Sequence, residues 1–156
     1  MNGLLLGLVL VAQCAVADTL PRPDHIVIVI DENKSFQQII GNNEAPYINA
    51  LARRGMLFTD AHGITHPSQP NYLALFSGNT HNITNDACLQ ELNGENLASI
   101  LISQNLSFVS YSEAMPDAAY LGCKSGEYAR KHNPLSNWSL IQCGMSLNEG
   151  RISNEK

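Results

Sequence analysis

The feature that most constrains the fold is an unbroken apolar run near the start of the chain. Residues 26–30 read Ile-Val-Ile-Val-Ile after His25, and the run ends abruptly at Asp31-Glu32-Asn33. A run that is apolar on both faces is typical of a central strand in a sheet that helices cover on both sides. Ligands bind at the carboxyl ends of strands in such sheets, so the oxygen-bearing side chains here either hold a metal or form a polar turn.

Helical and extended patterns alternate through the rest of the chain. Apolar residues share one face over 46–54, where Pro46 suits a first turn and Gly55 suits a helix stop. Further elements are expected as helices at 68–78 and around 97–101 and as strands at 56–59 and 107–111. The alternation predicts an α/β fold with a mostly parallel sheet flanked by helices.

A serine stands at the start of one of these helices. The heptapeptide at 66–72 reads His-Pro-Ser-Gln-Pro-Asn-Tyr, and the helix is expected to end at Gly78. Pro70 is compatible with this helix, because proline is tolerated in a first turn, where its missing N–H would be unpaired anyway. Ser68 therefore stands where free backbone N–H groups converge, which is a ready site for an anion. Taken by itself, Ser68 is either a helix N-cap or a reactive group.

The composition excludes some classes of function. The 156 residues make one domain at most, and the formal net charge is −5 without a basic stripe. A general nucleic-acid or membrane-surface binder would need such a stripe. No stretch after residue 17 is long and apolar enough to span a bilayer, so we expect no transmembrane segment in the mature chain.

The beginning of the chain differs from the rest. An apolar run over 4–12 is followed by Ala15-Val16-Ala17, a small-residue cleavage pattern. We predict a signal peptide over 1–17 and a secreted or periplasmic protein. The alternative is a buried first helix.

Removal of the predicted signal peptide would change the number of cysteines. Cys14 would leave with the signal peptide, whereas Cys88, Cys123 and Cys143 would stay. In an exported protein we expect a disulfide between Cys88 and Cys123. Cys143 is then free or paired outside this chain, and the wide spacings do not suggest a zinc site.

Three separated segments resemble one family of enzymes. They are 25–36, which holds the Glu-Asn-Lys-Ser-Phe sequence after the apolar run, 65–78 around Ser68, and 128–134, which reads Tyr-Ala-Arg-Lys-His-Asn-Pro. Together and in this order they resemble the phosphoesterase family, which contains secreted acid phosphatases, phosphoinositide phosphatases and bacterial phospholipases C. The resemblance implies the alkaline phosphatase-like superfamily, whose members hydrolyse phosphate and sulfate esters with bound metals.

The resemblance covers the N-terminal part of that family's domain. We therefore predict the N-terminal part of a phosphoesterase domain over 18–138, an atypical tail over 139–156, and a fold that is incomplete at the C-terminus. The family normally adds aspartate and histidine ligands from its C-terminal half, which the resemblance does not reach.

The resemblance also implies a metal site and a nucleophile. Glu32 and Asn33 fall on the family's first metal-binding pair. Ser68 falls on the nucleophile, which also contacts the metal. These three oxygen donors suit a divalent cation, whose identity stays open, and a hard cation wants about six ligands in all.

Substrate-binding residues follow from the same resemblance. Lys131 and His132 fall where the family places groups near the substrate phosphate, although cationic residues at a helix end would also explain them. Asn71 either contacts the substrate or holds the turn. Asn85 or Asp86 could approach the phosphate as well.

The chemistry of a serine nucleophile calls for a metal. A helix terminus contributes up to about 2 kcal/mol, roughly 1.5 pKa units, which cannot make an alkoxide. A bound divalent cation lowers the pKa of coordinated water from about 15.7 to about 7. We therefore predict a secreted metal-dependent hydrolase of phosphate monoesters that forms a phosphoserine at Ser68. Its substrate would be a small phosphorylated compound or a phospholipid headgroup. The alternatives are a phospholipase C-type phosphodiesterase and a truncated, inactive fragment.

Overall fold

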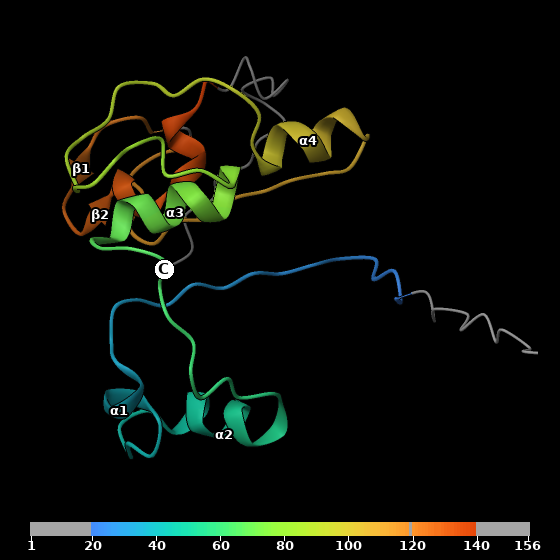
Figure 1. Ribbon diagram of the computed structural model, residues 1–156, viewed down its shortest axis with the longest axis vertical. Coiled ribbons are helices and arrows are strands. Elements are labelled where there is room, and N and C mark those ends of the chain that lie inside the picture. The colour runs from blue at the N-terminus through green and yellow to red at the C-terminus, as the bar shows by residue number, and fades with distance from the viewer. Residues whose placement is uncertain (1–19, 119, 140–156) are drawn as a thin grey trace, which may run out of the picture. The chain divides into compact units, whose positions relative to one another are not determined.

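The structure is a computed structural model that describes residues 20–118 and 120–139 (Figure 1). The chain divides into two units, one up to Leu57 and one from Phe58 onward, and each is described by itself. The predicted signal peptide at 1–17 and all but the first residue of the predicted tail at 139–156 lie outside the described residues. No helix within the described ranges is long and apolar enough to cross a membrane.

The first unit contains two helices, α1 (Phe36–Ile39) and α2 (Pro46–Arg54). α2 has the predicted bounds, with Pro46 in the first turn and Gly55 as the C-cap. The Asn49 side chain holds the connection between the helices. Its amide nitrogen donates to the carbonyl of Ile39 at 2.8 Å, and its oxygen accepts from the N–H of Gly41 at 2.6 Å.

The apolar run after His25 is extended, but its side chains are exposed, from 46% at Ile30 to 83% at Val27. The structure assigns no strand to this run, to 56–59 or to 107–111. Within the described residues, the only named strands form one antiparallel pair. The mostly parallel sheet therefore stays a prediction, because within residues 20–118 and 120–139 no strand pairs with the run.

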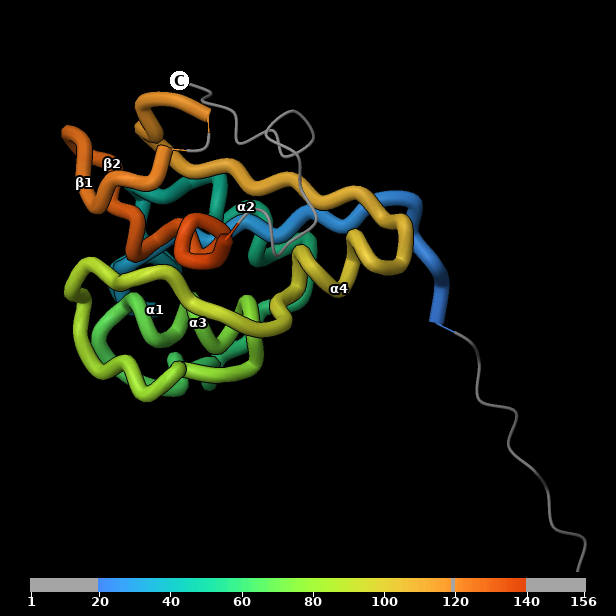
Figure 2. The backbone as a smooth tube through the Cα atoms, turned by 90° about the horizontal axis from the view of Figure 1, so that it is seen from above, coloured from blue at the N-terminus to red at the C-terminus, as the bar shows by residue number. Residues whose placement is uncertain are grey.

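The second unit holds the core. Its elements are α3 (Ser68–Ser77), α4 (Leu97–Ser103), β1 (Lys124–Ser125), β2 (Tyr128–Ala129) and the 3₁₀ helices η1 (Arg130–His132) and η2 (Pro134–Asn137). α3 packs against η1 and η2, so the chain after β2 returns to α3 (Figure 2). The buried apolar cluster is made of Leu73, Phe76, Ala98, Met115, Tyr128, Leu135 and Trp138.

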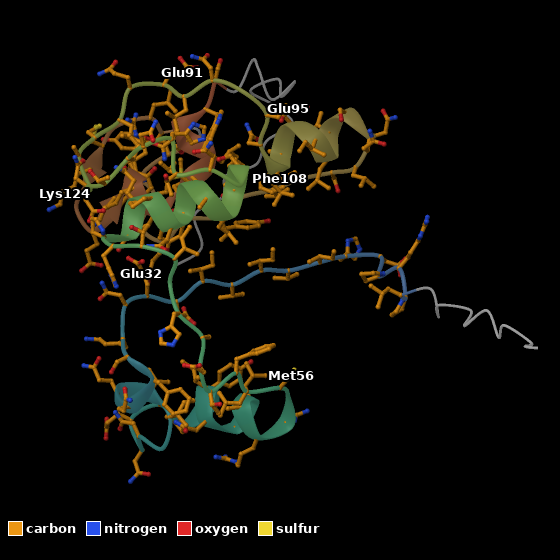
Figure 3. All side chains as sticks on the ribbon, viewed as in Figure 1. Glu32, Met56, Glu91, Glu95, Phe108 and Lys124 are labelled. Carbon is orange, nitrogen blue, oxygen red and sulfur yellow. A yellow bond between two sulfur atoms is a disulfide. The ribbon has the colours of Figure 1, made fainter. Side chains whose placement is uncertain are left out.

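Aromatic contacts and a backbone bridge close this core. The ring centroid of Phe76 in α3 lies 5.4 Å from that of Trp138 and 5.8 Å from that of Phe108, which Figure 3 shows below α4. An isolated parallel bridge joins Leu92 to Trp138, and the N–H of Leu92 donates to the carbonyl of Asn137 at 2.7 Å. The segment up to Trp138 is therefore an integral part of the unit.

A glycine and a disulfide hold the loop that follows α3. Gly78 ends the helix with φ +72° and donates its N–H to the carbonyl of Ala74 at 2.8 Å. Cys88 is joined to Cys123 by a disulfide, with the Cα atoms 5.7 Å apart. This is the pairing that the sequence predicts, and it ties the loop to the β1–β2 hairpin.

Candidate active site

Ser68 is the first residue of α3, and the N-cap position belongs to Pro67. The interpretation of Ser68 as an N-cap is therefore wrong. The backbone of Pro67 is extended, as at an N-cap, and the helix begins at Ser68, one residue earlier than an N-cap at Ser68 would give. Ser68 is half-buried in the first turn, where the backbone N–H groups of a helix favour negative charge.

Asn71 fastens the loop that leads to Ser68. Its amide nitrogen donates to the carbonyl of Thr65 at 2.7 Å and to that of Pro67 at 2.9 Å. Its oxygen accepts from the N–H of Thr65 at 3.2 Å. Of the two roles considered for Asn71, the contacts present are those of a residue that holds the turn.

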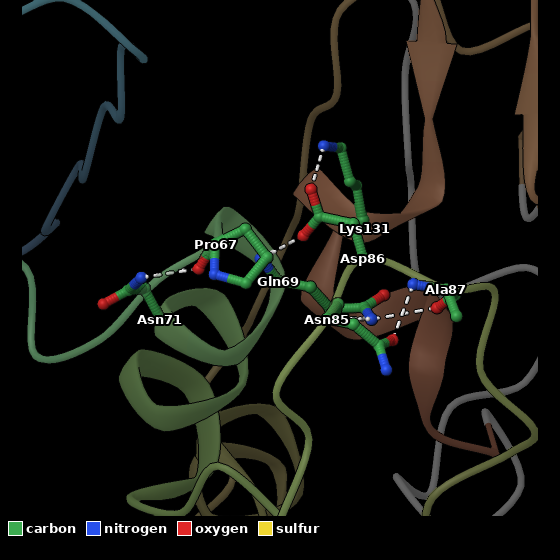
Figure 4. Close-up of polar contacts among 7 residues, drawn as sticks. All are labelled: Pro67, Gln69, Asn71, Asn85, Asp86, Ala87 and Lys131. Carbon is green, nitrogen blue, oxygen red and sulfur yellow. Dashed lines mark hydrogen bonds and ion pairs between the residues drawn. The ribbon is translucent and has the colours of Figure 1, made fainter.

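Gln69 fastens the other side of the first turn (Figure 4). Its side chain is almost fully buried and donates to the carbonyls of Asn85 and Ala87, both at 2.9 Å. The sequence analysis did not find this residue. Its position between Ser68 and Pro70 was the only signal, and that signal does not reveal a partner loop sixteen to eighteen residues ahead.

Asp86 connects α3 to η1. One carboxylate oxygen accepts from the backbone N–H of Gln69 at 3.0 Å, and the other pairs with Lys131 Nζ at 2.5 Å. Partial burial works to raise the pKa of Asp86, but the hydrogen bonds from Lys131 and Gln69 and the positive charges of Lys131 and His132 outweigh it. The net result is a pKa lowered below the usual 3.8, so Asp86 is an anion at neutral pH.

His132 packs on α3 from the same 3₁₀ helix. Its ring centroid lies 5.5 Å from that of Tyr72, with the planes tilted by 43°. Tyr72 follows Ser68 by one helical turn. The structure thus places Lys131 and His132, both in η1, beside the first turns of α3, which begins at Ser68. Their role near a substrate phosphate stays a prediction.

The predicted metal ligands lie in different units. Glu32 and Asn33 belong to the first unit and Ser68 to the second, so their mutual geometry stays a prediction. A carboxylate, an amide oxygen and a hydroxyl form a hard donor set that fits a divalent cation such as Mg²⁺ or Ca²⁺. Within residues 20–118 and 120–139, no three His, Cys, Asp or Glu side chains gather as a ligand cluster.

Comparison with known proteins shows the family to which the chain belongs. The model of the Phosphoesterase family matches residues 41–149, and the chain belongs to this family. It is 44% identical over 134 residues to a phosphatidylinositol-3-phosphatase of Mycobacterium tuberculosis, covering 84% of this chain and 44% of the relative.

Fungal relatives are similar over shorter parts. The chain is 37% identical to a phosphate-repressible acid phosphatase of Penicillium chrysogenum, over 72% of this chain and 28% of the relative. It is 36% identical to an acid phosphatase of Aspergillus fumigatus, over 54% and 21% respectively. The chain thus spans less than half the length of these curated relatives. No solved structure matched the chain.

Proposed function

We propose that this chain carries the nucleophile region of a secreted, metal-dependent phosphatase that hydrolyses phosphate monoesters through a phosphoserine at Ser68. The observation that carries the proposal is the position of Ser68 at the start of α3, with Lys131 and His132 packed around the same helical turns. The names of the relatives, phosphatases in each case, support a phosphate ester as substrate.

In the first step the Ser68 hydroxyl oxygen attacks phosphorus and the ester bond to the alcohol breaks. The alcohol leaves with its oxygen, and a phosphoserine remains. In the second step water attacks the phosphoserine, which releases inorganic phosphate and restores the hydroxyl. Lys131 and His132 would stabilise the negative charge on the phosphoryl oxygens, since fixed positive charge in a partly dry site favours such a transition state.

The activation of Ser68 needs more than the helix, whose dipole supplies at most about 2 kcal/mol. Glu32, Asn33 and Ser68 would hold a divalent cation. When bound, such a cation lowers the pKa of a coordinated hydroxyl and neutralises phosphoryl charge. In this proposal Asn71 and Gln69 orient Ser68. Asn71 holds the segment before Ser68, and Gln69 holds the first turn of α3 against the loop at Asn85.

The experiment compares wild type with Ser68→Ala on p-nitrophenyl phosphate from about pH 4 to about pH 9, with divalent metals added. Wild type should hydrolyse the ester and retain phosphate from a radiolabelled substrate after acid quenching, whereas Ser68→Ala should do neither. Ser103→Ala is the matched control, because Ser103 is an exposed helical serine that bonds only the carbonyl of Ile100.

Several outcomes would reject the proposal. Hydrolysis that survives in Ser68→Ala would rule out this nucleophile, and a wild type that neither binds a divalent metal nor hydrolyses the ester would rule out the enzyme. Faster hydrolysis of phosphatidylcholine than of monoesters would favour a phospholipase C-type phosphodiesterase instead.

A further inference from the structure

A cavity of about 310 Å³ opens beside the first turn of α3 in the second unit. Gln69 and Asp86 line one part of it, and the Cys88–Cys123 disulfide lines another. Small-molecule sites range from about 300 to about 1,000 Å³, so this cavity lies at the lower end of that range and has room for a small group.

The cavity collects the positive charge of its unit. Lys124, Arg130 and Lys131 all line it, and they are the only Lys or Arg residues among the described residues from 58 onward. Apart from Asp86, the acidic side chains in that part of the chain lie elsewhere, at Asp60, Glu91, Glu95, Glu113, Asp117 and Glu127. A concave site of one sign on a surface of the other sign attracts an oppositely charged ligand, here an anion.

Two of the three cations are already engaged within the unit. The Arg130 guanidinium donates to the carbonyl of Leu121 at 2.6 Å and to that of Leu89, and so ties the hairpin to the disulfide-linked loop. Lys131 pairs with Asp86, as described above. Both cations are fixed in place by these contacts.

Lys124 differs from the other two. Its side chain is exposed, and no ion pair or side-chain hydrogen bond of Lys124 occurs within the described residues. It stands in β1 at the outer edge of the unit (Figure 3). Its ammonium is therefore the one cation lining the cavity that has no partner among the described residues.

The cavity is linked to the proposed nucleophile through one residue of α3. Gln69, which lines it, directly follows Ser68, and its N–H is held by Asp86 from within the cavity wall. If Ser68 attacks the phosphate of a substrate, a second group on the same substrate would therefore lie near the cavity.

We propose that this cavity is a subsite for a second anionic group of the substrate, recognised by Lys124, so that the enzyme prefers phosphate esters with a further phosphate or carboxylate on the alcohol. The inference rests on the proposed function, which it deepens by naming the substrate class. Lys124 here determines specificity and takes no part in the bond-breaking step.

The test measures binding without turnover. Calorimetry on the full chain carrying Ser68→Ala compares fructose 1,6-bisphosphate with fructose 6-phosphate, which lacks one phosphate. The bisphosphate should bind about fivefold more tightly, the scale of one solvent-exposed ion pair. Adding Lys124→Gln should remove this preference, and Lys124→Arg should keep it.

The control is Arg53→Gln, which removes the same charge from an exposed residue of α2 in the other unit and should leave the preference intact. Three results would overturn the subsite. The first is equal affinity for the two ligands, and the second is a Lys124→Gln variant that loses the same affinity for both. The third is loss of the preference for the bisphosphate in Arg53→Gln as well.

The two proposals can fail separately. If wild type does not hydrolyse p-nitrophenyl phosphate but the Lys124-dependent preference persists, the anion site stands and the proposed activity is rejected. If hydrolysis is present and the preference is absent, only the subsite is rejected.

Discussion

Two donors from distant segments meet on the carboxylate of Asp86. The N–H of Gln69 comes from the first turn of α3, and the ammonium of Lys131 comes from η1. The pair is about 30% exposed on each side, so its strength lies between that of a surface ion pair and that of a buried one. Asp86 therefore links the first turn of α3 to η1.

The lowered pKa of Asp86 predicts how this contact responds to pH. The folded protein holds the ionised form more tightly than the unfolded chain, so the stabilisation is complete above about pH 4 and is lost as the pH falls through the lowered pKa. Asp86→Asn should cost about 0.5–1 kcal/mol at neutral pH. The difference in the free energy of unfolding between wild type and Asp86→Asn should then become smaller in acid. Urea unfolding followed by the fluorescence of Trp138 measures this difference.

The exposed Glu113 provides the comparison. Glu113→Gln should change the free energy of unfolding by less than about 0.5 kcal/mol at either pH. A gap for Asp86→Asn that stays constant or widens in acid would mean that the carboxylate is not held in its ionised form.

At the scale of elements, α3 has a proline at its N-cap and a left-handed glycine at its end. Gly78 adopts φ +72°, and a Cβ built there meets no atom within 4 Å. Replacement is therefore disfavoured by backbone conformation alone and not by crowding. The length of α3 fixes where both Ser68 and the core residue Phe76 lie.

We predict that Gly78→Ala lowers the free energy of unfolding by about 1–2 kcal/mol, because a non-glycine residue pays this cost in the left-handed region. Gly78→Asn should lose less, since asparagine tolerates that conformation better. Urea unfolding of both variants checks the order. Equal losses would indicate that α3 ends differently in solution.

On the scale of the whole molecule, the two units differ in how much they bury. α3 contributes five buried residues, whereas α1 and α2 contribute none. Elements with few buried contacts open at lower free energy than elements of a core. The only tryptophan, Trp138, is 1% exposed in the second unit, so its fluorescence reports on that unit.

Hydrogen exchange should separate the units. Amides of α2, such as those of Asn49 to Gly55, should exchange much faster than those at the end of α3, with protection differing by at least about tenfold. Mass spectrometry of peptides spanning 46–55 and 68–78 makes the measurement. Similar protection of the two peptides would show that α2 is covered in solution.

The parts of this molecule that local sequence determines were predictable. Pro46 and Gly55 mark the ends of α2 as expected, and Gly78 likewise marks the end of α3. The spacing of apolar residues located α4. Both signals act within a few residues of the chain. Ser68 and its neighbours were recognisable as a motif. The N-cap at Pro67 was not foreseen, because proline has no side-chain oxygen to cap a helix, whereas Ser68 has one.

The contacts that depend on distant segments were not predictable. Gln69 binds a loop that begins sixteen residues later, and Asp86 pairs with Lys131, which follows it by forty-five residues. No periodic pattern in the sequence predicts either contact. The apolar run after His25 carries a strong strand signal, but a strand is completed only by its neighbours. Its place in a parallel sheet is therefore still a prediction.

That apolar run also bears on how the protein must be handled. Five consecutive exposed β-branched residues, 26–30, have the composition of an aggregation-prone segment that can add to any free sheet edge. Acidic residues flank the run, Asp24 on one side and Asp31 and Glu32 on the other, and flanking charges of this kind act as gatekeepers against self-association. Glu32, which is proposed to hold the metal, is one of these flanking charges, so a cation bound there would neutralise it.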